Sequence, residues 1–115
     1  MIKVIGITGG IGSGKSTLSK HLKKIGYLVY ESDKYVSSIY KNPSKPFLNF
    51  LKNNISKEVV QNYKINKKKV ANIVFGSDEA RKMLEKYIHK KVKISRENFI
   101  KKNYTNKKGV IFADI

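Results

Sequence analysis

The sequence of 115 residues contains no cysteine and no tryptophan, and it has eight acidic residues against 25 basic ones. Without cysteine the chain can form no disulfide, no cysteine-ligated zinc site and no thiol nucleophile. No stretch reaches the roughly 18 uninterrupted apolar residues that a membrane-spanning helix needs. Residues 1–6 lack the layout of a secretory signal. The sequence therefore predicts a cytoplasmic protein that has no membrane as a partner.

Arginine is also scarce, because lysine supplies 23 of the 25 basic residues that give the net charge of +17. Lysine, isoleucine and asparagine share AT-rich codons, so this bias is consistent with genome composition. Proteins that read nucleic acids more often use arginine forks and aromatic platforms. We therefore expect solvated lysine faces and no specific nucleic-acid partner. A lysine-rich nucleic-acid-binding module stays open as an alternative of a different class.

The first third of the sequence predicts a βαβ unit, whose parallel strands are joined by a right-handed crossover. The apolar run at residues 2–7 predicts a strand buried on both faces. A helix is predicted over residues 16–25 and ends at Gly26, and residues 27–30 predict a second short strand. The stripe expected to be buried on this helix consists of Leu18, Leu22 and Ile25.

Residues 33–106 show a helical pattern throughout. Helix starts are predicted at Asp33, Ser44, Ser56 and Ser77. The last and longest helix has an expected buried stripe of Met83, Leu84, Tyr87, Ile88, Val92, Ile94 and Phe99. The aromatic residues expected in the core or at its rim are Tyr35, Tyr40, Tyr63 and Tyr87. Residues 110–115 predict a third buried strand with no helix after it, which indicates the front part of a longer protein.

Residues 9–16 read Gly-Gly-Ile-Gly-Ser-Gly-Lys-Ser and fit the phosphate-binding loop pattern G-x-x-x-x-G-K-[ST]. Glycines let successive backbone N–H groups turn inward around an anion, where a Cβ would obstruct them. The helix that begins near Lys15 directs its positive end at the same place. Lys15 is predicted to reach the β- and γ-phosphates of a nucleotide, and Ser16 to offer its hydroxyl to Mg²⁺.

Two acids stand at predicted strand ends, where open parallel sheets bind ligands. Asp33 is either a base that accepts the proton of an attacking hydroxyl or a plain helix cap. Asp114 is either an acid that helps to hold Mg²⁺ through water or a strand-end acid without a role. His89 is predicted to be a packed or hydrogen-bonded residue rather than a ligand.

Residues 5–17, Ile-Gly-Ile-Thr-Gly-Gly-Ile-Gly-Ser-Gly-Lys-Ser-Thr, closely resemble the opening of the dephospho-CoA kinase family. Residues 31–33 read Glu-Ser-Asp where that family has Asp-x-Asp, so a glutamate replaces the first aspartate. Residues 74–85 and 112–115 are also similar to family segments, and His89 falls where the family has Leu-His-Pro. The resemblance covers the chain in order and stops a little past the middle of a typical member.

This resemblance implies an α/β fold with the parallel sheet of a P-loop kinase. Three strands would be present, with the third strand between the first two, and a helical insertion would bind the acceptor. The C-terminal strands and the lid would be missing. The implied organisation is a single truncated kinase domain, with a nucleotide-binding core at residues 1–32 and 109–115 and a helical acceptor-binding region at about 33–108. We expect these 115 residues alone to be inactive.

The implied reaction is transfer of the γ-phosphoryl group of ATP to the ribose 3′-hydroxyl of dephospho-CoA, the last step of coenzyme A biosynthesis. Another small-molecule or nucleotide P-loop kinase stays open, since the loop does not name the acceptor. Asp33 is implied as the base and Ser16 as the residue that binds Mg²⁺. The implied ATP-binding residues are Gly12, Ser13, Gly14, Lys15, Ser16 and Thr17.

Overall fold

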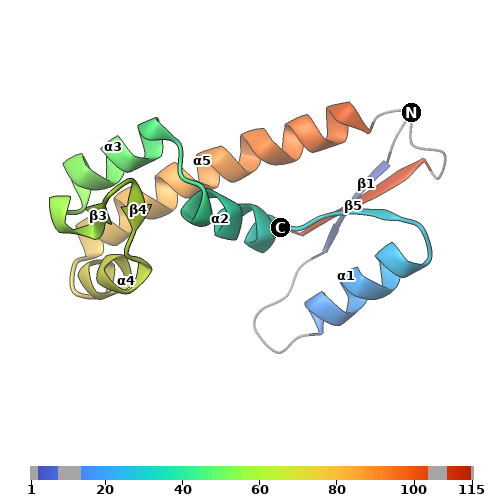
Figure 1. Cartoon of the computed structure of the whole chain (residues 1–115). Helices are drawn as coiled ribbons and strands as arrows, with labels where there is room; N and C mark the ends of the chain where they lie inside the picture. The colour runs from blue at the N-terminus through green and yellow to red at the C-terminus, as the bar shows by residue number, and fades with distance from the viewer. Residues whose placement is uncertain (1–2, 8–13, 104–108, 115) are drawn as a thin grey trace. The chain divides into compact units, whose positions relative to one another are not determined.

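The computed structural model describes residues 3–7, 14–103 and 109–114, and the chain forms two compact units (Figure 1). Met1–Asp33 and Lys93–Ile115 form the first, here called the sheet unit, and Lys34–Val92 form the second, the helical unit. The elements along the chain are β1 (Lys3–Ile7), α1 (Lys15–Lys24), β2 (Leu28–Tyr30), α2 (Ser32–Lys41), α3 (Lys45–Asn54), the 3₁₀ turn η1 (Lys57–Val59), β3 (Val60–Gln61), β4 (Lys64–Ile65), α4 (Lys67–Phe75), α5 (Asp78–Lys102) and β5 (Val110–Asp114).

The sheet of the first unit has the order β1-β5-β2, and β5 pairs in parallel with both neighbours. Ile7 lies opposite Asp114, and Tyr30 lies opposite Ala113. The carboxyl ends of the three strands therefore meet at one edge of the sheet. The predicted parallel α/β sheet, with the third strand between the first two, is confirmed.

The prediction that β1 is buried on both faces is wrong for most of the strand. Ile7 is buried, whereas Val4 is 45% exposed and Ile5 is 44% exposed. Among the described strands, β1 pairs only with β5 and lies at the edge of the sheet. Its side chains therefore have a neighbouring strand on one side only.

α1 contributes Leu22 to a small cluster with Ile7 and Val29 of the sheet. The predicted buried stripe is limited to this residue, because Leu18 is 45% exposed and Ile25 is 48% exposed. On α1 the side chains of Ser19 and Leu22, one turn apart, are buried, so the buried face of this helix is narrow.

Gly26 closes α1 as predicted, with φ at +98°. Its N–H donates to the carbonyl of Lys23 at 3.1 Å, and the N–H of Tyr27 donates to the carbonyl of Leu22 at 3.0 Å. These two bonds form the Schellman motif, which satisfies carbonyls at the end of a helix and needs a left-handed residue at this position. Glycine adopts that conformation without a Cβ clash.

The core of the helical unit combines side chains from α3, η1, β3, α4 and α5. Its buried members are Phe47, Leu48, Leu51, Val59, Val60, Val70 and Leu84. The ring of Tyr87 stacks on Phe47 and Phe50, with centroids 5.4 and 4.2 Å away. Such aromatic stacking adds to the free energy gained by burial. The three rings therefore stabilise the packing of α5 against α3.

Two of the predicted helix starts in this part of the chain are confirmed by capping bonds. The hydroxyl of Ser44 accepts the N–H of Phe47 at 3.3 Å, and the hydroxyl of Ser77 accepts the N–H of Ala80 at 3.2 Å. Asn66, which the sequence analysis did not single out, caps α4 in the same way. Side chains of this kind satisfy the donors that a helix start leaves unpaired.

The prediction that residues 33–106 are helical throughout is wrong between α3 and α4. Ser56 caps a single 3₁₀ turn rather than an α-helix, and β3 and β4 form a short antiparallel hairpin. The turn residues Asn62 and Tyr63 have φ of 53° and 63°. Two successive left-handed residues match the twist of a tight hairpin, and asparagine tolerates that conformation better than most residues.

The stripe predicted along α5 is not one continuous buried face. Leu84 is buried and Tyr87 is half-buried in the helical-unit core, whereas Phe99 contacts Tyr30 of the sheet unit with ring centroids 5.6 Å apart. Ile94, between these two contacts, is 44% exposed. The helix therefore supplies apolar side chains to each unit at a separate place along its length.

Tyr63→Gly is expected to stabilise the protein, since the tyrosine is 80% exposed rather than in the core or at its rim as predicted. Glycine removes the left-handed strain at this position, with an expected gain of about 0.5–1 kcal/mol in the free energy of unfolding. Urea unfolding of both proteins measures the difference. Asn62→Ala is the matched control and should lose stability. A lower urea midpoint for Tyr63→Gly would contradict this account of the turn.

Candidate functional site

Three segments of the sheet unit meet at the carboxyl edge of the parallel strands. Ile7 ends β1, α2 follows Tyr30 after one residue, and Asp114 ends β5. In open α/β sheets this edge is where ligands bind. The strand register therefore gathers the predicted functional segments in one place.

The structure describes the predicted phosphate loop only at its end. Residues 8–13, which include the predicted ATP-binding residues Gly12 and Ser13, lie outside the described residues. Gly14 precedes α1 with φ at +83°, and its carbonyl accepts the N–H of Leu18 at 3.0 Å. No described side chain caps this helix start, and its first turn holds no acidic residue. The positive end of α1 is therefore compatible with an anionic ligand.

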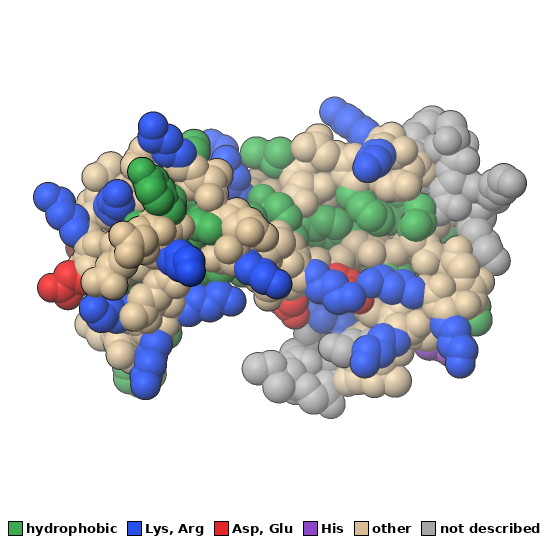
Figure 2. Space-filling model, in the orientation of Figure 1, with side chains coloured by type: hydrophobic (Ala, Val, Ile, Leu, Met, Phe, Trp, Pro, Cys, Tyr) green, Lys and Arg blue, Asp and Glu red, His purple; other side chains and the backbone are tan. Residues whose placement is uncertain are grey.

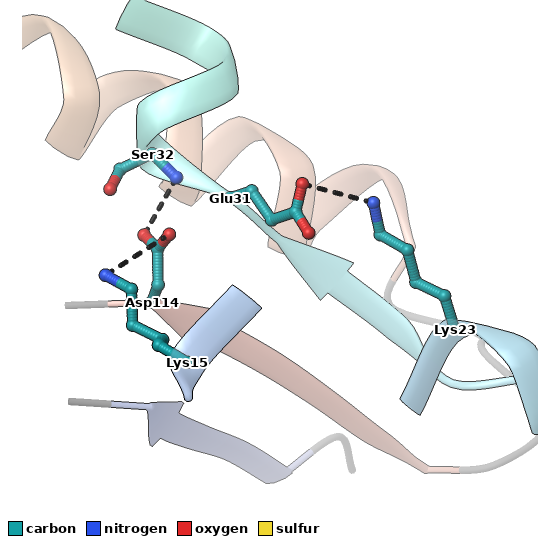
Figure 3. A network of polar contacts seen from close by, with 5 residues as sticks. All are labelled: Lys15, Lys23, Glu31, Ser32 and Asp114. Carbon is teal, nitrogen blue, oxygen red and sulfur yellow. Dashed lines mark hydrogen bonds and ion pairs between the residues drawn. The ribbon is translucent and has the colours of Figure 1, made fainter. Parts of the chain in front are cut away.

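Asp114 joins the ends of three elements through its carboxylate (Figure 3). One oxygen, Oδ1, accepts the backbone N–H of Ser32 at the start of α2, at 2.8 Å. The other, Oδ2, lies 3.8 Å from the Nζ of Lys15 at the start of α1. The side chain of Asp114 is 3% exposed and that of Lys15 is 20% exposed. The predicted phosphate-binding lysine thus lies beside a buried negative charge.

A second ion pair lies at the end of β2, between Glu31 Oε2 and Lys23 Nζ at 3.2 Å (Figure 3). Lys23 comes from the last turn of α1, so this pair links the end of that helix to the end of the strand. The side chain of Lys23 extends toward Glu31 and not toward Lys15 (Figure 3). The glutamate that replaces the first acid of the Asp-x-Asp pattern is therefore engaged by a cation of this chain.

Asp33 lies inside the first turn of α2 and is exposed. The alternative in which it caps this helix is wrong, because α2 already begins at Ser32. The N–H of Ser32 is accepted instead by Asp114, 82 residues away in the sequence. The carboxylate of Asp33 is thus left available to solvent at the start of α2, near the end of β2.

The remaining predicted site residues are spread over two helices. Thr17 is exposed on α1, and of Ser16 only the backbone is described, as part of the same helix. His89 is exposed on α5 rather than packed. Within residues 3–7, 14–103 and 109–114, no three His, Asp or Glu side chains gather as a metal site. None of the helices described is long and apolar enough to cross a bilayer.

The helical unit carries a separate hollow of about 400 Å³. Its lining residues are Ser37, Tyr40, Lys41, Lys64, Ile65 and Lys67. The Nζ of Lys67 lies 5.3 Å from the centroid of the Tyr40 ring, within the range of a cation–π contact. Burial raises the pKa of the Tyr40 phenol, so this group adds no negative charge beside the lysines at physiological pH.

Burial also raises the pKa of Tyr87, and the nearby Tyr35 raises it further. Both rings belong to the helical unit, and Lys91 lies over the Tyr87 ring at 5.6 Å from its centroid. A raised pKa keeps the Tyr87 phenol protonated near pH 7, and its ring stacks in the core of the helical unit.

The sequence analysis missed Ser32 and Lys23 as members of the polar network at the sheet edge. Ser32 takes part through its backbone N–H, which has no signature in the sequence. Lys23 is one of many lysines, and only the approach of α1 to β2 selects it. The pairing of Asp114 with Lys15 likewise depends on the register between β1 and β5.

The strand order β1-β5-β2, with a glycine-preceded helix after β1, defines a P-loop kinase fold. A family model described as dephospho-CoA kinase matches residues 3–115. The chain belongs to the dephospho-CoA kinase family.

Known proteins similar to this chain include dephospho-CoA kinases of Bartonella quintana and Fusobacterium nucleatum. They are 34% identical over 114 residues and 38% identical over 116 residues, and each match covers 99% of this chain and 57% of the relative. The structure is similar to that of TT1252 from Thermus thermophilus, with a TM-score of 0.69, 26% identity, and coverage of 99% of this chain and 56% of that one. A dephospho-CoA kinase from Campylobacter jejuni has the same fold, with a TM-score of 0.73 at 24% identity over 100% of this chain and 57% of its own. This chain therefore spans little more than half the length of these relatives.

Gly14→Ala is expected to lower the free energy of unfolding by about 1 kcal/mol through backbone strain alone. A Cβ at this position would meet no atom of the described residues within 4 Å, but φ is +83°. Gly109→Ala is the matched control, because its φ is +67° and no atom of the described part of the chain would lie within 4 Å of the added Cβ. Urea unfolding should show similar losses for both variants, and calorimetry should show weakened binding of ATP for Gly14→Ala only. Equal loss of ATP binding in both would contradict the assignment of Gly14 to the site.

Proposed function

We propose that the full-length protein transfers the γ-phosphoryl group of ATP to the ribose 3′-hydroxyl of dephospho-CoA and so produces coenzyme A. Family membership over residues 3–115 supports this activity. The observation that carries the proposal is the position of Lys15, at the start of α1 directly after the left-handed Gly14. There a cation and a helix N-terminus lie together at the ligand-binding edge of the sheet.

ATP would be held mainly through its phosphates. Lys15 would attract the β- and γ-phosphates and reduce the negative charge that the attacking hydroxyl meets. Thr17, exposed on α1, would contact the α-phosphate. The backbone of the loop would contribute N–H groups from Gly12, Ser13 and Gly14.

Mg²⁺ would be held by the hydroxyl of Ser16 together with the phosphates of ATP. This ion usually keeps several waters and takes few ligands from the protein. The position of Ser16 in the first turn of α1, directly after Lys15, supports this role. When bound, Mg²⁺ supplies charge that neutralises the phosphates.

Asp33 would act as the base that accepts the proton of the 3′-hydroxyl. Its carboxylate is exposed in the first turn of α2, directly after the residue whose N–H is held by Asp114. A base must come within hydrogen-bond reach of the hydroxyl that it deprotonates. The hydrogen bond from Ser32 to Asp114 holds the backbone next to Asp33 at the sheet edge, which supports this role.

The helical region at about residues 33–108 would bind the acceptor, and residues 1–32 and 109–115 would form the nucleotide-binding core. The hollow lined by Tyr40, Lys41, Lys64 and Lys67 supports this division, because three ammonium groups suit an anionic substrate. Figure 2 shows further Lys and Arg side chains spread over the visible face of both units. This spread does not support the nucleic-acid alternative, for which a stripe of basic residues is typical.

Lys15→Ala in the full-length protein is expected to abolish phosphorylation of dephospho-CoA, because the charge facing the β- and γ-phosphates is lost. A coupled assay of ADP release measures turnover, and thermal melting verifies that the variant folds. Lys23→Ala is the matched control: it opens the neighbouring ion pair with Glu31 and should keep its turnover. Unchanged turnover of Lys15→Ala would rule out the phosphate-loop assignment.

Asp33→Asn is expected to lower turnover by about 10² to 10⁴, the range of general acid–base catalysis. The affinity for ATP should barely change, since Asp33 would face the acceptor. Steady-state kinetics and calorimetry with ATP measure the two quantities separately. A variant that loses ATP binding but keeps its turnover would reverse the assignment.

A further inference from the structure

Asp114 is the only charged side chain that is buried among the described residues, at 3% exposure. A carboxylate in such a position is unfavourable unless hydrogen bonds or an opposite charge compensate it. Here both oxygens are engaged, one by a backbone N–H at 2.8 Å and the other by an ammonium at 3.8 Å. The two partners belong to the two elements that the proposed reaction uses, α1 and α2.

We propose that Asp114 is a positioning residue that couples the occupancy of the phosphate site to the start of α2. The inference rests on the proposed function, because it takes Lys15 as the residue that binds phosphate. It assigns Asp114 a task other than holding Mg²⁺ or contacting a substrate. The carboxylate acts through Lys15 on one side and through Ser32 on the other.

The carboxylate of Asp114 and a phosphate of the nucleotide would compete for the ammonium of Lys15. The ammonium of Lys15 lies 3.8 Å from Asp114 Oδ2. This distance permits charge attraction but is long for a hydrogen bond, so the ammonium can move to a phosphate oxygen. The free energy of separating the two charges then opposes nucleotide binding.

The contact with Ser32 fixes where α2 begins. An anion at a helix N-terminus is favourable because it meets unpaired N–H groups and the positive end of the helix dipole. Asp114 is itself held by pairing of β5 on both sides, so its position is defined by the sheet. The residue after Ser32 is Asp33, whose backbone is thereby placed relative to β5.

The ion pair between Glu31 and Lys23 provides an internal comparison at the same sheet edge. It joins α1 to the end of β2, at 3.2 Å, whereas Asp114 joins α1 to the end of β5, and it includes neither Lys15 nor the N–H of Ser32. If charge at this edge had a purely structural role, the two ion pairs would have equivalent effects on nucleotide binding. The proposal requires them to differ in their effect on nucleotide binding.

The first measurement is the dissociation constant of ATP by calorimetry in EDTA, with the full-length protein. Asp114→Asn keeps an amide oxygen for the N–H of Ser32 but removes the charge that competes for Lys15. We expect metal-free ATP to bind about fivefold more tightly, at the lower end of typical couplings between sites. Lys23→Ala is the control and should bind with the wild-type affinity. Unchanged or weaker binding by Asp114→Asn would overturn the proposal.

The second measurement is kcat and KM for dephospho-CoA in the presence of Mg²⁺. Asp114→Ala removes both contacts and should lower kcat by about 10- to 100-fold, as small displacements of catalytic groups do. Asp114→Asn should recover most of this loss, because the start of α2 is still held. Equal losses of kcat in both variants, with weaker binding of ATP only when Mg²⁺ is present, would overturn the proposal in favour of an acid that holds Mg²⁺ through water.

The experiment separates failure of this inference from failure of the proposed function. Wild-type protein that binds no ATP would refute the proposed function itself. Wild-type protein that binds ATP, beside an Asp114→Asn variant with unchanged metal-free affinity, would refute only the role of Asp114. If Asp114→Ala does not fold, the affinity of Asp114→Asn for metal-free ATP still tests the role of Asp114.

Discussion

The parallel pairing of β5 with both of its neighbours is the interaction on which the rest of the sheet unit depends. Ile111 and Ala113 of this strand are fully buried, and the register places Asp114 beside the end of β1. Because successive side chains of a strand point to opposite faces, a slip of one residue would turn Asp114 away from α1 and α2. The polar network at the sheet edge is therefore a consequence of backbone hydrogen bonds.

Charge at this edge is organised differently from charge on the remaining surface. The chain has a large excess of lysine, and most lysines are exposed, where water and salt screen them. Lys15 lies instead beside a buried carboxylate. A compact ammonium on a flexible stem can change partners more readily than a guanidinium held by two parallel bonds. A lysine is thus well suited to a site where an anion of the protein and an anion of the substrate compete.

Features with a local cause could be predicted from the sequence, and features with a long-range cause could not. Gly26 as the end of α1 and Ser44 as a helix start depend on neighbouring residues, and both are confirmed. The hairpin at Asn62 was missed because its two left-handed turn residues are Asn62 and Tyr63, without the glycine that usually marks a tight hairpin in a sequence. The contact of Asp114 with the N–H of Ser32 joins residues 82 positions apart, so only the sheet register reveals it. The roles of Lys15 and Asp33 in the reaction remain predictions.

The strand at the centre of the sheet is also the last of the three in the sequence, which has a consequence for the order of folding. During synthesis β1 and β2 emerge long before β5, and neither has a described pairing with the other. The core of the helical unit, by contrast, is built from residues within Lys34–Val92, so its contacts become available earlier. Contacts of long sequence separation form late, because closing the intervening chain costs entropy. We therefore expect the carboxyl edge of the sheet to assemble after the helical unit, and until then the apolar strand β1 has no partner for its backbone among the described strands.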